Sequence, residues 1–136
     1  MSHPVRNVLI VVGAILAGSI LVSVLESLIL ALFTLPPEMN RADIGAVTAY
    51  IERSETRELA LYLLIHALGA FLSGWIIGRF AASSWPLLAF VTGLIWTFIG
   101  VSEIVLLSHP LWYAISDTCV YLPMTILGLK LTARQI

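Results

Sequence analysis

Four long apolar stretches, separated by charged residues and prolines, make up most of this 136-residue sequence. They cover residues 8–33, 59–77, 86–107 and 111–131. Each has the roughly 20 residues that an α-helix needs to cross about 30 Å of hydrocarbon. Backbone polar groups must be satisfied internally in lipid, so such stretches are expected to be helical. The sequence therefore predicts an all-α membrane protein, a single transmembrane domain over residues 1–136 with four transmembrane helices in an up-down bundle.

The composition supports this class and excludes others. The chain is 60% hydrophobic and 11% charged, with a mean hydropathy of +1.01. A soluble domain carries about 25% charged residues, and a core this small cannot bury the excess apolar surface. Seven Lys and Arg against eight Asp and Glu leave no basic face for nucleic acid. A single cysteine excludes an internal disulfide and a site built from several thiolates.

The segment between the first two apolar stretches is the longest polar part of the chain. Apolar residues recur there at helical spacing beside charged ones, at Ile44, Val47 and Ile51. Asn40 occupies an N-cap position, with Asp43 three residues later. We expect a short amphipathic helix over residues 41–53 on the membrane surface or over the mouth of the bundle, and a solvated loop is the alternative. Pro36–Pro37 is predicted to end the first long helix.

The distribution of Lys and Arg predicts the orientation in the membrane. With four spans, both termini lie on the same side. Residues on that side are Arg6, Arg79, Lys130 and Arg134, and those on the other are Arg41, Arg53 and Arg57. Because cytoplasmic loops carry the excess of positive residues, the small majority predicts that both termini are cytoplasmic.

Each predicted helix contains one ionisable residue well inside its apolar stretch. They are Glu26, His66, Glu103 and Asp117. The helical rise places all four about 9 to 12 Å below the outer ends of their helices, in one layer. Charged groups in membrane helices are costly and usually face a bundle interior or cavity, so we expect a shared polar site. The alternatives are that Glu103 reaches the headgroups alone and that His66 is a neutral contact between helices.

Neighbouring residues on each helix indicate which side faces inward. Ser19, Ser23 and Ser27 share a stripe with Glu26 on the first helix. On the second helix, His66 begins a line of small residues, Ala70, Gly74 and Gly78. Small residues at this spacing allow another helix to approach closely. We therefore expect these stripes to point into the bundle.

Three carboxylates and an imidazole cannot all stay charged and unneutralised at such depth. We expect a proton, a small cation, a ligand amine or an arginine of the outer loop to complete the site. Arg53 and Arg57 are the candidate lids of that loop. His109 is a candidate residue at the mouth, and a histidine that only caps the loop is the alternative.

These residues favour two functions. The first is an ion- or small-ligand-binding site linked to proton or cation transport, since chains of Asp, Glu and His commonly mark ion pathways. The second is an accessory or structural subunit of a larger membrane complex or homo-oligomer, in which the polar layer sets helix register. An enzyme is disfavoured, because the sequence has no Glu-x-x-His pair, HExxH or GxSxG motif. Neither a metal nor a cofactor is identified.

The second half of the sequence resembles a known set of proteins. The segments that carry the resemblance are His66-Ala67-Leu68-Gly69-Ala70 with Gly74, His109-Pro110-Leu111-Trp112, and Asp117 with Tyr121-Leu122-Pro123 before Gly128. The chain is similar over most of its length to small uncharacterised bacterial four-helix integral membrane proteins. This resemblance implies a multi-pass protein of the bacterial inner membrane and transfers no substrate, cofactor or catalytic residue.

Overall fold

The computed structural model describes residues 2–32, 40 and 42–132. All regular structure in these residues is helical, and the helices are α1 (His3–Leu32), α2 (Ile44–Arg53), α3 (Thr56–Phe80), α4 (Trp85–Leu106) and α5 (Leu111–Thr132). The four longer helices are each long and apolar enough to cross a membrane. The predictions of an all-helical chain and of four long apolar helices are therefore confirmed.

The observed boundaries refine the predicted ones. Helix α3 extends beyond the predicted stretch 59–77 at both ends, where Glu58 in the first turn and Arg79 in the last turn suit the helix dipole. The predicted end of the first helix at residue 33 and its Pro36–Pro37 stop lie outside the described residues. Helix α2 begins at Ile44, three residues later than the predicted start at 41.

The cap of α2 differs from the one expected. Asp43, and not Asn40, is the N-cap residue, and its Oδ1 atom accepts hydrogen bonds from the backbone N–H groups of Gly45 and Ala46. A carboxylate at this position satisfies free N–H groups of the first turn. The Asn40 side chain instead accepts a hydrogen bond from Ala42 N, at 3.0 Å, in the turn before the helix.

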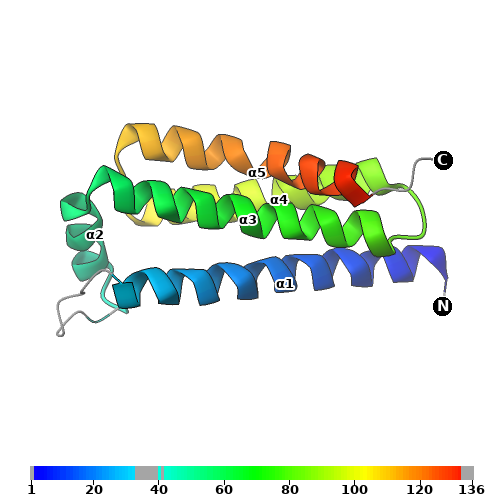
Figure 1. Ribbon diagram of the computed structural model, residues 1–136, viewed down its shortest axis with the longest axis horizontal. Coiled ribbons are helices and arrows are strands. Elements are labelled where there is room, and N and C mark those ends of the chain that lie inside the picture. The colour runs from blue at the N-terminus through cyan, green and yellow to red at the C-terminus, as the bar shows by residue number, and fades with distance from the viewer. Residues whose placement is uncertain (1, 33–39, 41, 133–136) are drawn as a thin grey trace.

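Figure 1 shows the four long helices side by side, with α2 set across one end of them. Helix α1 begins and α5 ends at the opposite end. Helix α3 is central, because it packs against both α5 and α1, while α4 packs mainly against α5. The central helix and its neighbours thus supply the side chains that meet inside the bundle.

Helices α3 and α5 approach each other through glycines. A Cβ atom at Gly74 would lie 1.9 Å from the carbonyl oxygen of Thr125, and one at Gly128 would lie 2.1 Å from that of Phe71. No larger residue fits at either position without separating the helices. His66 precedes Gly74 on the same side of α3, and Asp117 precedes Gly128 on the same side of α5. The close approach of the two helices therefore brings His66 and Asp117 within hydrogen-bond distance.

Helix α1 packs against α3 in the same way. A Cβ atom at Gly18 would lie 2.6 Å from the carbonyl oxygen of Gly69. The buried residues of α1 are Ala14, Gly18 and Ile29. The outward side of α1 is exposed and apolar, with Val5, Leu9, Val12, Leu16, Ile20, Val24 and Leu28. Glu26 lies at the edge of the side of α1 that contacts α3, close to the interface between α3 and α5.

Candidate functional site

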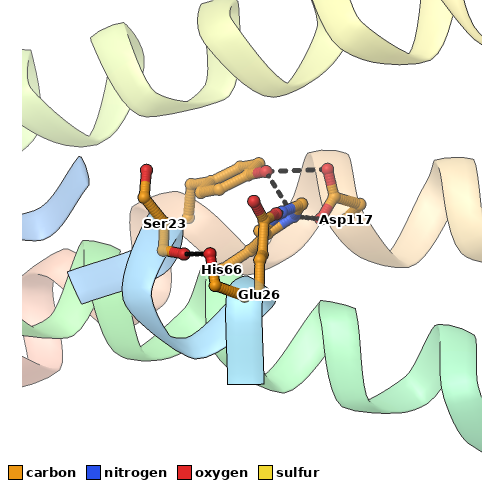
Figure 2. A network of polar contacts seen from close by, with 6 residues as sticks. Ser23, Glu26, His66 and Asp117 are labelled. Atoms are coloured by element: carbon orange, nitrogen blue, oxygen red, sulfur yellow. Dashed lines mark hydrogen bonds and ion pairs between the residues drawn. The ribbon is translucent and has the colours of Figure 1, made fainter. Parts of the chain in front are cut away.

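His66 forms hydrogen bonds with two carboxylates from two other helices (Figure 2). Its Nδ1 atom lies 2.7 Å from Oδ1 of Asp117 on α5, and its Nε2 atom lies 3.2 Å from Oε1 of Glu26 on α1. The side chains of His66 and Asp117 are 6% and 2% exposed, whereas that of Glu26 is 32% exposed. We call these three residues the triad. Its inner member is Asp117 and its outer member is Glu26.

The hydrogen bonds determine how many protons the triad holds. A neutral imidazole has one N–H donor and one acceptor nitrogen, but both nitrogens of His66 face carboxyl oxygens. Each of these two contacts needs one proton between nitrogen and oxygen. The protons are carried either by an imidazolium between two carboxylates or by a neutral imidazole and one carboxyl group. Both arrangements leave the triad with one net negative charge.

Tyr121 is a further member of the site that the sequence did not identify as functional. Its hydroxyl donates to Oδ2 of Asp117 at 2.8 Å and lies 3.1 Å from Nδ1 of His66. Asp117 and Tyr121 are four residues apart on α5, so they lie on the same side of that helix. This i, i+4 spacing of a carboxylate and a phenol was the available signal. The hydroxyl satisfies the second oxygen of a buried carboxylate.

Aromatic stacking connects the triad to the centre of the bundle. The ring of Tyr121 stacks on both His66 and Trp96, with centroid distances of 6.1 and 5.9 Å. The Trp96 indole N–H donates to the Ser73 hydroxyl at 2.9 Å. That hydroxyl in turn lies 2.9 Å from the carbonyl oxygen of Ala14 on α1. These contacts join α1, α3, α4 and α5 directly beneath the triad and hold its aromatic floor in place.

A pocket of about 230 Å³ lies between the triad and α2. Its lining residues come from all five helices and the turns that join them: Glu26, Leu30, Val47, Tyr50, Ile51, Ser54, Leu59, Tyr62, His66, Glu103, Leu107, His109 and Tyr113. Asp117 is not among them. His66, which lines the pocket, connects it to the buried Asp117 carboxylate.

Glu103 and His109, two other residues expected at the site, also line this pocket. Glu103 forms no hydrogen bond or ion pair within the part of the chain that the structure describes, so it does not join the triad directly. The Nδ1–H group of His109 donates to the carbonyl oxygen of Leu107 at 2.7 Å. The His109 ring stacks on Tyr113 at 4.8 Å. His109 thus both caps its loop and contributes to the pocket wall.

The structure does not bring the other expected residues to the site. Arg53 is exposed and does not line the pocket. Arg57 does not line it either, and its guanidinium lies 3.5 Å from the carboxylate of Glu55 at the surface. Arg53 lies in the last turn of α2 and Arg57 in the first turn of α3, and neither contributes to the pocket lining. Arg41 lies outside the described residues.

The serine stripe of the first helix also differs from expectation. Ser23 and Ser27 are exposed, and the Ser27 hydroxyl donates to the Ser23 carbonyl oxygen at 2.8 Å (Figure 2). Small residues, and not serines, form the contact side of α1, because they allow the close packing on α3. Glu26 reaches His66 from the edge of that contact side.

Helix α2 covers the pocket and is attached to α3. The Tyr50 hydroxyl donates to the carboxylate of Glu58, a buried residue in the first turns of α3. Ile51 packs in an apolar cluster with Leu59 of α3 and Tyr113 of α5. The Tyr50–Glu58 contact could not be predicted from the sequence, because it joins two segments that only the fold brings together.

The chemistry of the donors indicates which ligands the site can hold. Among the described residues, no group of three or more His, Cys, Asp or Glu side chains has the geometry of a metal site. Both nitrogens of His66 are occupied by hydrogen bonds. The lining contains two carboxyl groups, two imidazoles and no Lys or Arg among the described residues. Such a lining favours a proton or a cationic group over an anion.

Comparison of the chain with protein-family models, with curated proteins and with solved structures gives no match.

Proposed function

We propose that the chain is a multi-pass membrane protein that binds a small cation in the pocket above the triad and releases a proton when it does so. The observation that carries this proposal is the position of His66, which is buried, hydrogen-bonded to Glu26 and Asp117, and part of the pocket lining. Chains of acidic residues and histidine inside membranes commonly form proton relays.

Electrostatics links the cation to the proton. The two protons of the triad leave one net negative charge, and Glu103 adds a third carboxyl group beside it. A cation that enters the pocket compensates the same negative charge that the protons compensate. In a partly dry site, opposite charges a few ångströms apart interact strongly, so binding of the cation favours loss of a proton. The proton leaves through Glu26, the triad member nearest the surface.

The arrangement in the membrane is part of the proposal. We propose an up-down bundle with α2 as an amphipathic helix at the interface, since Val47 and Ile51 turn toward the bundle while Glu52 and Arg53 are exposed. The distribution of Lys and Arg supports cytoplasmic termini, which places the pocket on the outer side. The resemblance noted above supports the bacterial inner membrane. Proton-linked transport of the cation is the wider form of this proposal.

The alternative role is an accessory or structural subunit of a larger membrane complex or homo-oligomer, in which the polar layer sets helix register. The small residues of α3 were expected to point into the bundle. Gly74 of α3 and Gly128 of α5 pack within the chain, against Thr125 and Phe71.

The proposal is tested by counting protons. The full chain in detergent is placed in weakly buffered solution, sodium chloride or propylammonium chloride is added, and the released protons are measured with a pH-sensitive dye. We expect saturable release by at least one of the two salts, reduced by Glu26→Gln and retained by Glu52→Gln, a charge-matched change on the exposed side of α2. Absence of saturable release with both cations contradicts the proposal.

A further inference from the structure

We propose that the ligand of this pocket is a small organic cation with an apolar part, such as an alkylammonium ion. This inference rests on the proposed function and names the ligand class. It follows from three properties of the pocket that are independent of the triad: its size, its aromatic walls and the position of its free carboxylate.

The size of the pocket limits the ligand. A cavity of about 150 Å³ in a protein core holds benzene, and typical drug-sized ligands occupy pockets of about 300–1,000 Å³. The pocket of about 230 Å³ lies between these values. It therefore has room for a ligand somewhat larger than a six-carbon ring, and for much more than a dehydrated inorganic ion.

The walls of the pocket are apolar and aromatic. Aliphatic side chains line it from every side, including Leu30, Ile51 and Leu107. Tyr62 and Tyr113 add aromatic rings, and Tyr113 is itself fixed by stacking on His109. Aliphatic walls favour a ligand with hydrocarbon groups, because they cannot replace the hydration shell of an inorganic ion. Aromatic rings attract organic cations through their electron-rich faces.

The charges of the pocket determine the sign of the ligand. Glu26 already bonds to His66, whereas Glu103 has no hydrogen-bond or ion-pair partner among the described residues. An ammonium group that donates to Glu103 would give this carboxylate the partner that it lacks. The hydrocarbon part of the same ligand would then lie against the tyrosines and leucines beneath α2.

The experiment measures binding of an ammonium series to the full chain in detergent by titration calorimetry. Methyl-, ethyl-, propyl- and butylammonium are compared with potassium at equal ionic strength. Each added methylene buried in the pocket should strengthen binding about fourfold. Propanol and butanol, which have the same hydrocarbon part without the charge, serve as controls for partition into detergent and should bind far more weakly.

Variants test the residues that carry the inference. Tyr113→Leu should weaken propylammonium binding roughly three- to thirtyfold, while Tyr113→Phe, which keeps the ring, should bind like the wild type. Glu103→Gln should remove most of the preference for ammonium over alcohol, and Glu52→Gln should keep it. The alkyl series on the wild-type chain decides the question even where Tyr113→Leu does not fold.

The outcomes separate the two proposals. Equal affinity for potassium and for all alkylammonium ions, together with proton release, overturns the ligand class and leaves the proposed function in place. Affinity that is the same for butanol and butylammonium also overturns the ligand class. Absence of both binding and proton release with every cation overturns both proposals.

Discussion

The imidazole of His66 and the carboxylate of Asp117 are 51 residues apart in the sequence and 2.7 Å apart in the structure. Their helices can approach because glycines line the contact between α3 and α5. Glu26 completes the arrangement from α1. The polar site therefore depends on the tight packing of the helices. A substitution in the glycine contact should alter the polar site, and a substitution in the polar site should alter the packing.

Removing the Asp117 carboxylate should lower the free energy of unfolding more than removing the Glu26 carboxylate. Asp117→Ala leaves a buried imidazole without its closest partner, and breaking a buried pair in this way costs about 3–5 kcal/mol. Glu26→Gln should cost only about 1 kcal/mol or less, because the Glu26 side chain is 32% exposed. Unfolding of both variants in the same detergent measures the difference. Equal losses of unfolding free energy in the two variants would mean that the difference in burial between the two carboxylates has no energetic effect.

The approach of α3 to α5 should not tolerate a single methyl group. Gly74→Ala places a Cβ atom 1.9 Å from the Thr125 carbonyl oxygen and should lower the free energy of unfolding by about 1–3 kcal/mol or more. Gly13→Ala is the matched control, since nothing lies within 4 Å of its Cβ position. That change should stabilise the helix by about 0.5–1 kcal/mol. Similar melting temperatures for the two variants would refute the close approach.

Helix α2 should loosen when its contact with α3 is removed. Glu58→Ala deletes the acceptor of the Tyr50 hydroxyl, and a hydrogen bond to a charged group contributes about 1.5–3 kcal/mol. Amide hydrogen exchange in residues 44–53 should then be roughly ten- to hundredfold faster. Glu55→Ala is the control, because Glu55 pairs with Arg57 at the surface. Unchanged exchange in the Glu58 variant would show that apolar packing alone holds α2.

The position of Trp96 beneath the triad should depend on its hydrogen bond to the hydroxyl of Ser73. Ser73→Ala leaves the buried indole N–H of Trp96 without its acceptor, which costs about 1–3 kcal/mol. The tryptophan emission should shift as the hydrogen bond is lost. Ser102→Ala is the control, since the Ser102 hydroxyl donates within its own helix to Phe98. An unchanged emission and stability in the Ser73 variant would contradict this connection between α3 and α4.

Much of the fold could be predicted from the sequence because lipid imposes a strong length and composition requirement. Four apolar stretches became four long helices, with ends within a few residues of those expected where they lie in the described part of the chain. The line of small residues on α3 also indicated a close contact, and Gly74 makes one with α5. The sequence did not say which helix would be the partner, since that depends on packing among distant segments.

The site was predictable only in part. The common depth of the ionisable residues led to Glu26, His66 and Asp117, which the structure brings together. The position of Arg57 could not be predicted, because helix rotation decides whether a loop arginine points into the pocket or to the surface. Tyr50 was missed for a related reason, since its partner Glu58 lies across a turn in another helix. Such contacts depend on tertiary geometry and leave no periodic pattern.

The central claim is that His66 is held between two carboxylates at the floor of a pocket that takes cations. Nitrogen-15 resonances of the histidine rings, recorded on the full chain in detergent with and without propylammonium, test it most directly. We predict that both nitrogens of His66 are hydrogen-bonded without the cation and that their resonances shift saturably when it is added, while those of the exposed His3 stay unchanged. A His66 ring with one free nitrogen in the cation-free chain, or one whose resonances do not respond to any cation, would contradict this claim.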